Sequence, residues 1–313
     1  MDSANHAAFD AEARKAAGIP SEDMGSDFAG RVAVITGGAS GIGFGLARKA
    51  AALGMRVVLA DVEDTALDRA TALLKEQGHD VAAVTTDVSS ESSVRHLAEQ
   101  ANDAWGIPPW LVVNNAGVGV PSRFLDSSPE DTRWTIEVNM FGVLNGMYAF
   151  LPGLVSRDAG HLVNTASMAG LLVAPGGSVY AATKHAIIAL TEVVYRELAE
   201  HGSKVGISCL CPGLVNSNLS TSVRNRPAHY GGPATGLAVP GEELGAPYRR
   251  ALPTVITPDQ VADQVFEAIR QRRFWILTHQ VVYAERIRRR AEQIASQVNP
   301  NHESVDHIAA AFL

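Results

Sequence analysis

Aromatic residues, long apolar runs and positive charge are all scarce in this chain of 313 residues. Aromatic side chains make up 6% of it, too few to suggest a surface on which nucleic-acid bases stack. The formal net charge of -7 also opposes binding to a polyanion. No apolar run approaches the roughly 20 residues that a membrane-spanning helix needs. We therefore expect neither a nucleic acid nor a membrane as a partner.

Cysteine is also scarce, since Cys209 and Cys211 are the only two. On a strand their α-carbons would lie ~6.6 Å apart, near the upper limit for a disulfide. We expect two buried packing residues and no metal site, because no His/Cys cluster in the sequence supplies further ligands. The start, Met1-Asp2-Ser3-Ala4-Asn5, lacks the basic and apolar regions of a signal peptide, which predicts a cytoplasmic protein.

What the chain does have is a regular alternation of short apolar segments with helical ones. With 46% hydrophobic residues, it has enough apolar side chains for one large core. Such alternation predicts an α/β fold with a parallel sheet covered on both faces. The expected strands are 31–36, 56–61, 81–86, 110–115, 161–166, 205–211 and 274–278.

A glycine-rich turn follows the first expected strand. The segment from Gly37 to Gly43 contains four glycines and leads into an Ala/Leu-rich helix. Glycines permit a tight turn and a close approach of the backbone to a pyrophosphate at a helix N-terminus. The second strand ends at Asp61, whose carboxylate is placed to accept hydrogen bonds from an adenosine ribose and to repel a 2′-phosphate. The pattern predicts NAD rather than NADP as the cofactor.

A second group of residues suggests acid/base chemistry. Tyr180 and Lys184 are four residues apart, so they share one face of a helix. The charge of Lys184 is expected to lower the pKa of Tyr180 below the ~10 of a free phenol. Ser167 ends a buried strand, at the edge of the sheet where ligands bind. The same residues also suit two solvated neighbours and a helix cap, but the glycine turn in the same chain favours proton transfer.

Together these motifs resemble the short-chain dehydrogenases/reductases over about residues 30–280. The fingerprint Thr-Gly-x-x-x-Gly-x-Gly begins at Thr36, and further family motifs follow in order at Asp87-Val88, 114–117, Asn139 and Pro212-Gly213. The resemblance implies a single Rossmann domain, doubly wound, with seven strands in the order 3-2-1-4-5-6-7. It also implies a homodimer or homotetramer, formed through helices at about 131–157 and 178–201.

The resemblance also implies roles for individual residues. Tyr180 would be the catalytic acid/base, Ser167 would orient the substrate oxygen, Lys184 would tune Tyr180 and hold the nicotinamide ribose, and Asn139 would anchor a water relay. Ser217 stands where the family often has Thr. The residues expected to contact NAD (NADH) are Gly37, Ser40, Gly41, Ile42, Gly43, Asp61, Asp87, Val88, Asn115, Ala116, Gly117, Tyr180, Lys184, Pro212, Gly213, Val215 and Ser217.

Three segments lie outside the regular alternation. Residues 1–29 form an N-terminal extension, expected to be mobile or to lie along a neighbouring subunit. Residues 214–250 form a long loop beside the nicotinamide site, which favours a substrate lid. Within the C-terminal helical tail, 281–313, residues 281–298 have the spacing of an amphipathic helix. Its run Arg288-Arg289-Arg290 is expected to be a solvated face, with a membrane-surface role the weaker alternative.

The expected substrate site is apolar, so the substrate should be a small hydrophobic alcohol or ketone. The lid also resembles that of the branch with aryl-alcohol dehydrogenases of bacterial lignin breakdown. We therefore expect an NAD-dependent oxidoreductase that interconverts a secondary alcohol and a ketone, aromatic or alicyclic. The alternatives are a non-catalytic nucleotide-sensing or scaffold protein, which would have lost Tyr180 or Lys184, and an epimerase or dehydratase, which would space its glycines differently. The expected substrate contacts are Val118, Ser167, Met168, Leu171, Leu214, Leu219, Val223 and Tyr230.

Overall fold

The computed structural model describes residues 28–120, 122–233 and 255–300. Its centre is a seven-stranded sheet in the order β3-β2-β1-β4-β5-β6-β7, in which every pairing is parallel. The strand order reverses between β1 and β4, which opens a crevice at the carboxyl ends of these strands. The predicted fold and strand order are confirmed. The strands are β1 (Val32–Thr36), β2 (Arg56–Asp61), β3 (Val81–Thr85), β4 (Pro109–Asn114), β5 (His161–Thr165), β6 (Gly206–Cys211) and β7 (Trp275–Leu277).

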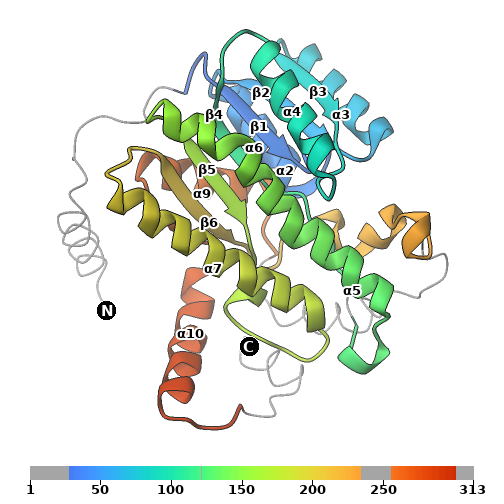
Figure 1. Cartoon of the computed structure of the whole chain (residues 1–313), viewed down its shortest axis with the longest axis vertical. Helices are drawn as coiled ribbons and strands as arrows, with labels where there is room; N and C mark the ends of the chain where they lie inside the picture. Colours follow the sequence, from blue (N-terminus) through green and yellow to red (C-terminus); the bar gives the residue numbers. More distant parts are fainter. Residues whose placement is uncertain (1–27, 121, 234–254, 301–313) are drawn as a thin grey trace.

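Helices cover both faces of the sheet (Figure 1). Helices α2 (Gly41–Ala52), α3 (Asp64–Glu76) and α9 (Pro258–Arg270) bury their apolar side chains against one face. Helices α4 (Glu91–Asp103), α6 (Gly142–Ser156) and α7 (Ser178–Glu200) do so against the other. Successive residues of β1 alternate between the two cores, as strand geometry requires, and all five are buried. The sheet is therefore buried on both faces, which explains why its strands are nearly continuous apolar runs.

Residues 129–156 form one long helical segment across the second face. It consists of α5 (Pro129–Ile136), one turn of π-helix η2 (Glu137–Phe141) and α6, and it begins at an N-cap serine followed by proline. By length and composition alone it is able to cross a membrane, although polar residues such as Asn139 interrupt its apolar run. Val143, Phe150 and Leu154 are buried in the core, so this segment packs as part of the α/β layer.

The ends of the domain differ in part from expectation. Phe28 is 2% exposed and makes edge-on contacts with Trp110 and Phe266, so the core begins within the expected extension. Residues 1–27 and 301–313 lie outside the described residues. The tail helix is α10 (Gln280–Ala295). Both cysteines are free and buried in β6, as predicted, and their Sγ atoms lie 3.9 Å apart.

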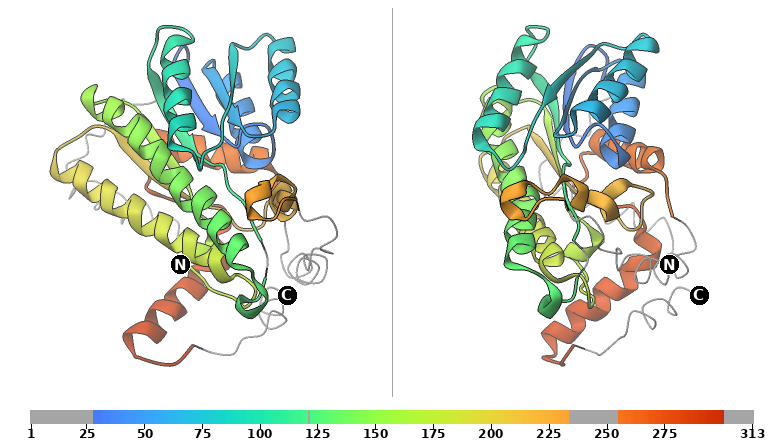
Figure 2. Two further views of the ribbon diagram at one scale, coloured as in Figure 1. Left: turned by 45° about the vertical axis from the view of Figure 1, so that its right-hand side comes forward. Right: turned by 90° about the vertical axis from the view of Figure 1, so that its right-hand side faces the viewer.

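The expected lid is described over residues 214–233, and the rest of it to residue 250 lies outside the described residues. It contains two 3-10 helices, η4 (Asn218–Asn225) and η5 (Ala228–Tyr230). Figure 2 shows this segment, in orange, beside the end of α5 and below the blue strands β1 and β2. A β-bridge between Val215 and Ile256 joins the start of the lid to the segment that leads into α9.

Candidate active site

A cavity of about 740 Å³ opens at the carboxyl ends of the strands, where the topology predicts a ligand site. The glycine turn between β1 and α2 forms one of its walls. A Cβ at Gly43 would lie 2.0 Å from the carbonyl oxygen of Gly37, and Gly37 itself has a positive φ of 64°. Only glycine fits this turn, which leaves the N-terminal amides of α2 facing the cavity for an anionic group.

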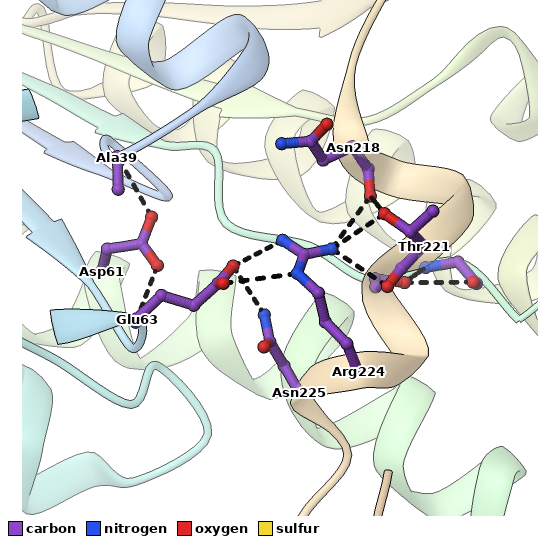
Figure 3. Close-up of polar contacts among 9 residues, drawn as sticks. Ala39, Asp61, Glu63, Asn218, Thr221, Arg224 and Asn225 are labelled. Atoms are coloured by element: carbon purple, nitrogen blue, oxygen red, sulfur yellow. Dashed lines mark hydrogen bonds and ion pairs between the residues drawn. The ribbon is translucent and has the colours of Figure 1, made fainter. Parts of the chain in front are cut away.

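Asp61 occupies the next wall, at the end of β2 (Figure 3). Its carboxylate accepts hydrogen bonds from the backbone N–H of Ala39, at 3.0 Å, and of Glu63, at 3.1 Å. Burial raises the pKa of Asp61, and these backbone hydrogen bonds act in the opposite direction. The carboxylate is therefore held in place while lining the cavity, where it can accept hydrogen bonds from a diol.

The loop after β4 is held against β1 by Thr36. Its Oγ1 accepts hydrogen bonds from the N–H groups of Asn115, at 2.9 Å, and Ala116, at 3.1 Å. The Nδ2 of Asn115 donates in turn to the carbonyl oxygen of Thr36, at 3.0 Å. Residues 115–117 therefore form a further fixed part of the cavity wall.

Tyr180 and Lys184 reach the cavity from α7, and Ser167 from the end of β5. The Oγ of Ser167 accepts a hydrogen bond from the N–H of Ala169, at 3.1 Å, and also hydrogen-bonds the Tyr180 side chain. The Nζ of Lys184 donates to the carbonyl oxygen of Thr165, at 3.0 Å, and lies 5.6 Å from the centre of the Tyr180 ring. The three side chains predicted to act together are thus gathered in one place.

Burial dominates the ionisation of both helix residues. It raises the pKa of Tyr180, although the hydrogen bond with Ser167 opposes this, and it lowers the pKa of Lys184 to about 8. The expectation that Lys184 lowers the pKa of Tyr180 is wrong for this arrangement. The reason is that Nζ is directed to the carbonyl of Thr165, while desolvation penalises the charged form of each group.

Asn139 lies in the π-helical turn η2 and is fully buried. Its Oδ1 accepts from the N–H of Val118, at 2.8 Å, and its Nδ2 donates to the carbonyl oxygen of the same residue, at 2.9 Å. A Cβ at Gly117 would lie 3.2 Å from this Oδ1 and 3.6 Å from the Nζ of Lys184. Asn139 therefore fixes the loop beside Lys184, and its role in a water relay stays a prediction.

Comparison with known proteins agrees with this geometry. Residues 31–228 match the family model described as short chain dehydrogenase. The chain belongs to the short-chain dehydrogenase family. This is a family of oxidoreductases, and the predicted family resemblance is confirmed.

Three similar proteins show how far the likeness extends. A short-chain dehydrogenase from Burkholderia phymatum, solved in complex with NAD, has 41% sequence identity and a TM-score of 0.82 over 88% of this chain and 98% of its own. The CLA biosynthesis dehydrogenase/reductase of Lactiplantibacillus plantarum is 32% identical over 90% of this chain and 99% of its own. A C alpha-dehydrogenase of a Sphingobium species is 31% identical over 88% of each, which confirms the predicted likeness to the lignin-dehydrogenase branch.

Most of the predicted site residues of this short-chain dehydrogenase line the cavity. Of the expected cofactor contacts, all but Gly43 do so, and Gly43 lies beneath the turn. Of the expected substrate contacts, the wall includes Val118, Ser167, Met168, Leu214 and Leu219.

Three expected substrate contacts lie outside the wall. Leu171 packs against the core on the face of the sheet that α4, α6 and α7 cover. Val223 and Thr221 are the two residues of η4 that do not line the cavity. Tyr230 is turned toward Glu137, and burial, with a hydrogen bond to that carboxylate, raises its pKa to about 12.

Several residues of the cavity wall were not identified from the sequence, among them two charged or polar groups of residues. Glu63, Arg224 and Asn225 lie at the adenosine end, and Tyr283 and Arg286 reach it from the tail helix α10. For the tail, the sequence contained one usable signal. Positions 283, 287 and 290 are four and three residues apart, so they share one face of a helix that can pack against the domain.

The expectation of a solvated arginine run in the tail is wrong for Arg290. Its Nη1 donates to the carbonyl oxygen of Leu171 and lies 3.0 Å from the Nε2 of His185. The tail helix is thereby attached to the loop after β5 and to α7, both of which border the cavity.

The buried ammonium predicts a pH-dependent stability. Between the folded pKa of Lys184, about 8, and its ordinary value of 10.5, the unfolded chain binds a proton that the folded chain lacks, so stability rises with pH. Lys184→Met removes this contribution. The free energy of unfolding of the wild type, minus that of the variant, should rise by about 2 kcal/mol from about pH 8 to about pH 9.5 in urea titrations. A constant difference would contradict a buried, titrating Lys184.

Proposed function

We propose that the protein is an NAD-dependent dehydrogenase that interconverts a secondary alcohol and a ketone on a hydrophobic, aromatic or alicyclic substrate. The observation that carries the proposal is the gathering of Ser167, Tyr180 and Lys184 on one wall of the cavity that Asp61 lines at its other end. An acid/base group and a site for an adenosine ribose therefore share one cavity. The similarity to a dehydrogenase solved with NAD supports the same cofactor here.

The wall residues fit a dinucleotide. The glycine turn and the N-terminus of α2 suit its diphosphate, and the carboxylate of Asp61 suits the adenosine ribose. Lys184 would hold the nicotinamide ribose, and Ser217 would hold the carboxamide. When bound, the nicotinamide supplies the acceptor or donor of the hydride.

Ser167 and Tyr180 would act on the substrate oxygen. The hydroxyl of Ser167, fixed by the N–H of Ala169, donates a hydrogen bond that orients this oxygen. Because burial raises the pKa of Tyr180, its phenol is protonated near neutral pH and is ready to donate a proton to a ketone oxygen. Alcohol oxidation needs the tyrosinate instead, so this direction gains as the pH rises.

The walls around the reacting oxygen support a hydrophobic substrate. Val118, Met168, Leu172, Leu214 and Leu219 all line this part of the cavity. An apolar surface of this kind binds an apolar ligand by removing both from water. The similarity to a C alpha-dehydrogenase and to a dehydrogenase/reductase of CLA biosynthesis supports the same reaction type.

The surface supports assembly into a homodimer or homotetramer. Phe141, Tyr148 and Val155 on the η2 and α6 helices, and Val193 on α7, are large apolar side chains exposed to solvent in one chain. Exposed apolar side chains of this size are typical of an interface when they lie together. We further propose a cytoplasmic protein, with the enzyme domain at 30–280, its lid at 214–250 and a helical tail at 281–313.

Removal of the phenolic oxygen tests the acid/base role. Tyr180→Phe should lower kcat by about 10²-fold or more while leaving the affinity for NADH nearly unchanged, because only proton transfer is lost. Tyr195→Phe, at a tyrosine on the same helix that does not line the cavity, is the matched control and should leave both quantities nearly unchanged. Steady-state rates with an aromatic secondary alcohol and NADH fluorescence titration measure the two effects. Near-normal turnover of Tyr180→Phe would remove Tyr180 from the mechanism.

Asp61 should set the choice of cofactor. A 2′-phosphate would meet its carboxylate, so kcat/KM should favour NAD over NADP by at least about 10²-fold. The change of Asp61→Ser with Val62→Arg removes the repulsion and adds a phosphate ligand, which should move the preference toward NADP. Asp68→Ser, at an exposed position of α3, should leave the ratio unchanged. A wild-type preference for NADP would overturn the assignment.

The lid should contact the substrate through Leu219 of η4. Leu219→Ser removes an apolar contact from the cavity wall and should raise KM for bulky alcohols several-fold to about 10-fold, with little change in KM for NAD. Val223→Ser makes a comparable polar change on the same helix, away from the wall, and should have a much smaller effect. Equal effects of the two variants would indicate that η4 is only structural.

A further inference from the structure

The lid is joined to the adenosine end of the cavity by a cluster of polar contacts (Figure 3). The guanidinium of Arg224, in η4, pairs with both carboxylate oxygens of Glu63, which follows β2. The Nη2–Oε1 distance is 2.5 Å and the Nε–Oε2 distance is 3.3 Å. The Nδ2 of Asn225 donates to the same Oε1, at 2.9 Å. Glu63 and Arg224 are 161 positions apart, and both line the cavity.

Arg224 is held in position for this pairing by the lid itself. Its Nη1 donates to the carbonyl oxygen of Thr221, at 2.9 Å, and to Thr221 Oγ1, at 3.0 Å. One edge of the guanidinium is thus used inside η4, and the other edge faces Glu63. This fork geometry is specific to arginine, since lysine presents a single point charge. The side chain is therefore directed to Glu63 while remaining partly exposed to solvent.

The pair also affects the charge beside the ribose site. The hydrogen bond from Arg224 holds the pKa of Glu63 below its ordinary value, so Glu63 is ionised at neutral pH. The N–H of Glu63 donates to Asp61, whose pKa the charge of Glu63 raises. Arg224 neutralises one of two adjacent carboxylates and so favours the ionised form of Asp61. The contact between Glu63 and Arg224 thus closes the cavity wall and also favours the ionised Asp61, the residue proposed to bind the ribose.

Contacts elsewhere hold the lid more permanently. The Oγ of Ser222 is buried and both donates to and accepts from the backbone of Gly119, at 3.1 and 2.9 Å. Arg226 pairs with Asp131 of α5, and both side chains are largely buried. The side chains of Arg224 and Glu63 are 37% and 30% exposed, so water and salt screen this pair. Of these three attachments, the Glu63–Arg224 pair is the easiest to open.

We propose that Glu63 and Arg224 form a latch that closes the lid over the adenosine half of the cofactor, so that the lid controls cofactor release as well as substrate access. This inference rests on the proposed NAD site. Glu63 and Arg224 are positioning residues, because each acts by holding the wall in place. A contact that opens with screening allows the cofactor to leave without disturbing the buried attachments of the lid.

The rate of NADH dissociation tests the latch without any alcohol. Arg224→Gln and Glu63→Gln should each raise this rate about 2- to 5-fold in stopped-flow displacement followed by NADH fluorescence. Added NaCl should accelerate release from the wild type more than from either variant, because only the wild type has the ion pair to screen. The double change of Glu63→Arg with Arg224→Glu should return the rate toward that of the wild type.

A matched control separates the latch from a general loss of charge. Arg48 pairs with Asp259 at 2.6 Å, joins two distant elements and is similarly exposed at 39%, but it does not line the cavity. Arg48→Gln should leave NADH dissociation unchanged. Equal rates and equal salt dependence in the wild type, Arg224→Gln and Glu63→Gln would overturn the latch, as would an equal acceleration by Arg48→Gln.

A second measurement keeps the latch distinct from the proposed function. Hydrogen–deuterium exchange of residues 218–226 in the protein alone should be faster in Arg224→Gln than in the wild type or in Arg48→Gln. Faster exchange in Arg224→Gln would support closure of the lid by the ion pair, independently of which substrate the enzyme oxidises. Unchanged exchange would overturn the latch. Failure of the wild type to bind NADH would overturn the proposed NAD site itself.

Discussion

The burial of Lys184 is the constraint on which the site depends. Lys184 as a whole is 3% exposed, and a charge removed from water needs partners close by. The carbonyl oxygen of Thr165 supplies one, and the face of the Tyr180 ring lies beneath the ammonium. Both contacts require α7 to lie tightly against the end of β5. A Cβ at Gly170 would lie 2.6 Å from the carbonyl oxygen of Lys184, so a glycine there permits the approach.

The sequence predicted what local pattern determines. Buried parallel strands are apolar runs bounded by turns, so all seven strands were placed to within about two residues. The glycine turn, Asp61 and the group at 167, 180 and 184 were found because each lies at the end of a strand or at helical spacing. Parallel strands bring such ends to one edge of the sheet, so topology then places these residues around one cavity.

What the sequence did not predict depends on distance and on burial. Glu63 and Arg224 are 161 positions apart, and no local pattern connects a carboxylate after β2 with an arginine in the lid. Arg290 contacts Leu171 across 119 positions for the same reason. The direction of the Tyr180 pKa shift was wrong because a helical spacing shows proximity to Lys184 but does not show how much water surrounds the phenol. Desolvation is a property of the packed structure.

The helix η4 of the lid contributes to both ends of the cavity. Leu219, near its start, belongs to the apolar part of the wall, and Arg224 and Asn225, at its end, contact Glu63. One short helix therefore meets the substrate wall at one end and the adenosine wall at the other. Because these contacts belong to one helix of eight residues, movement of this helix changes the wall at both ends of the cavity.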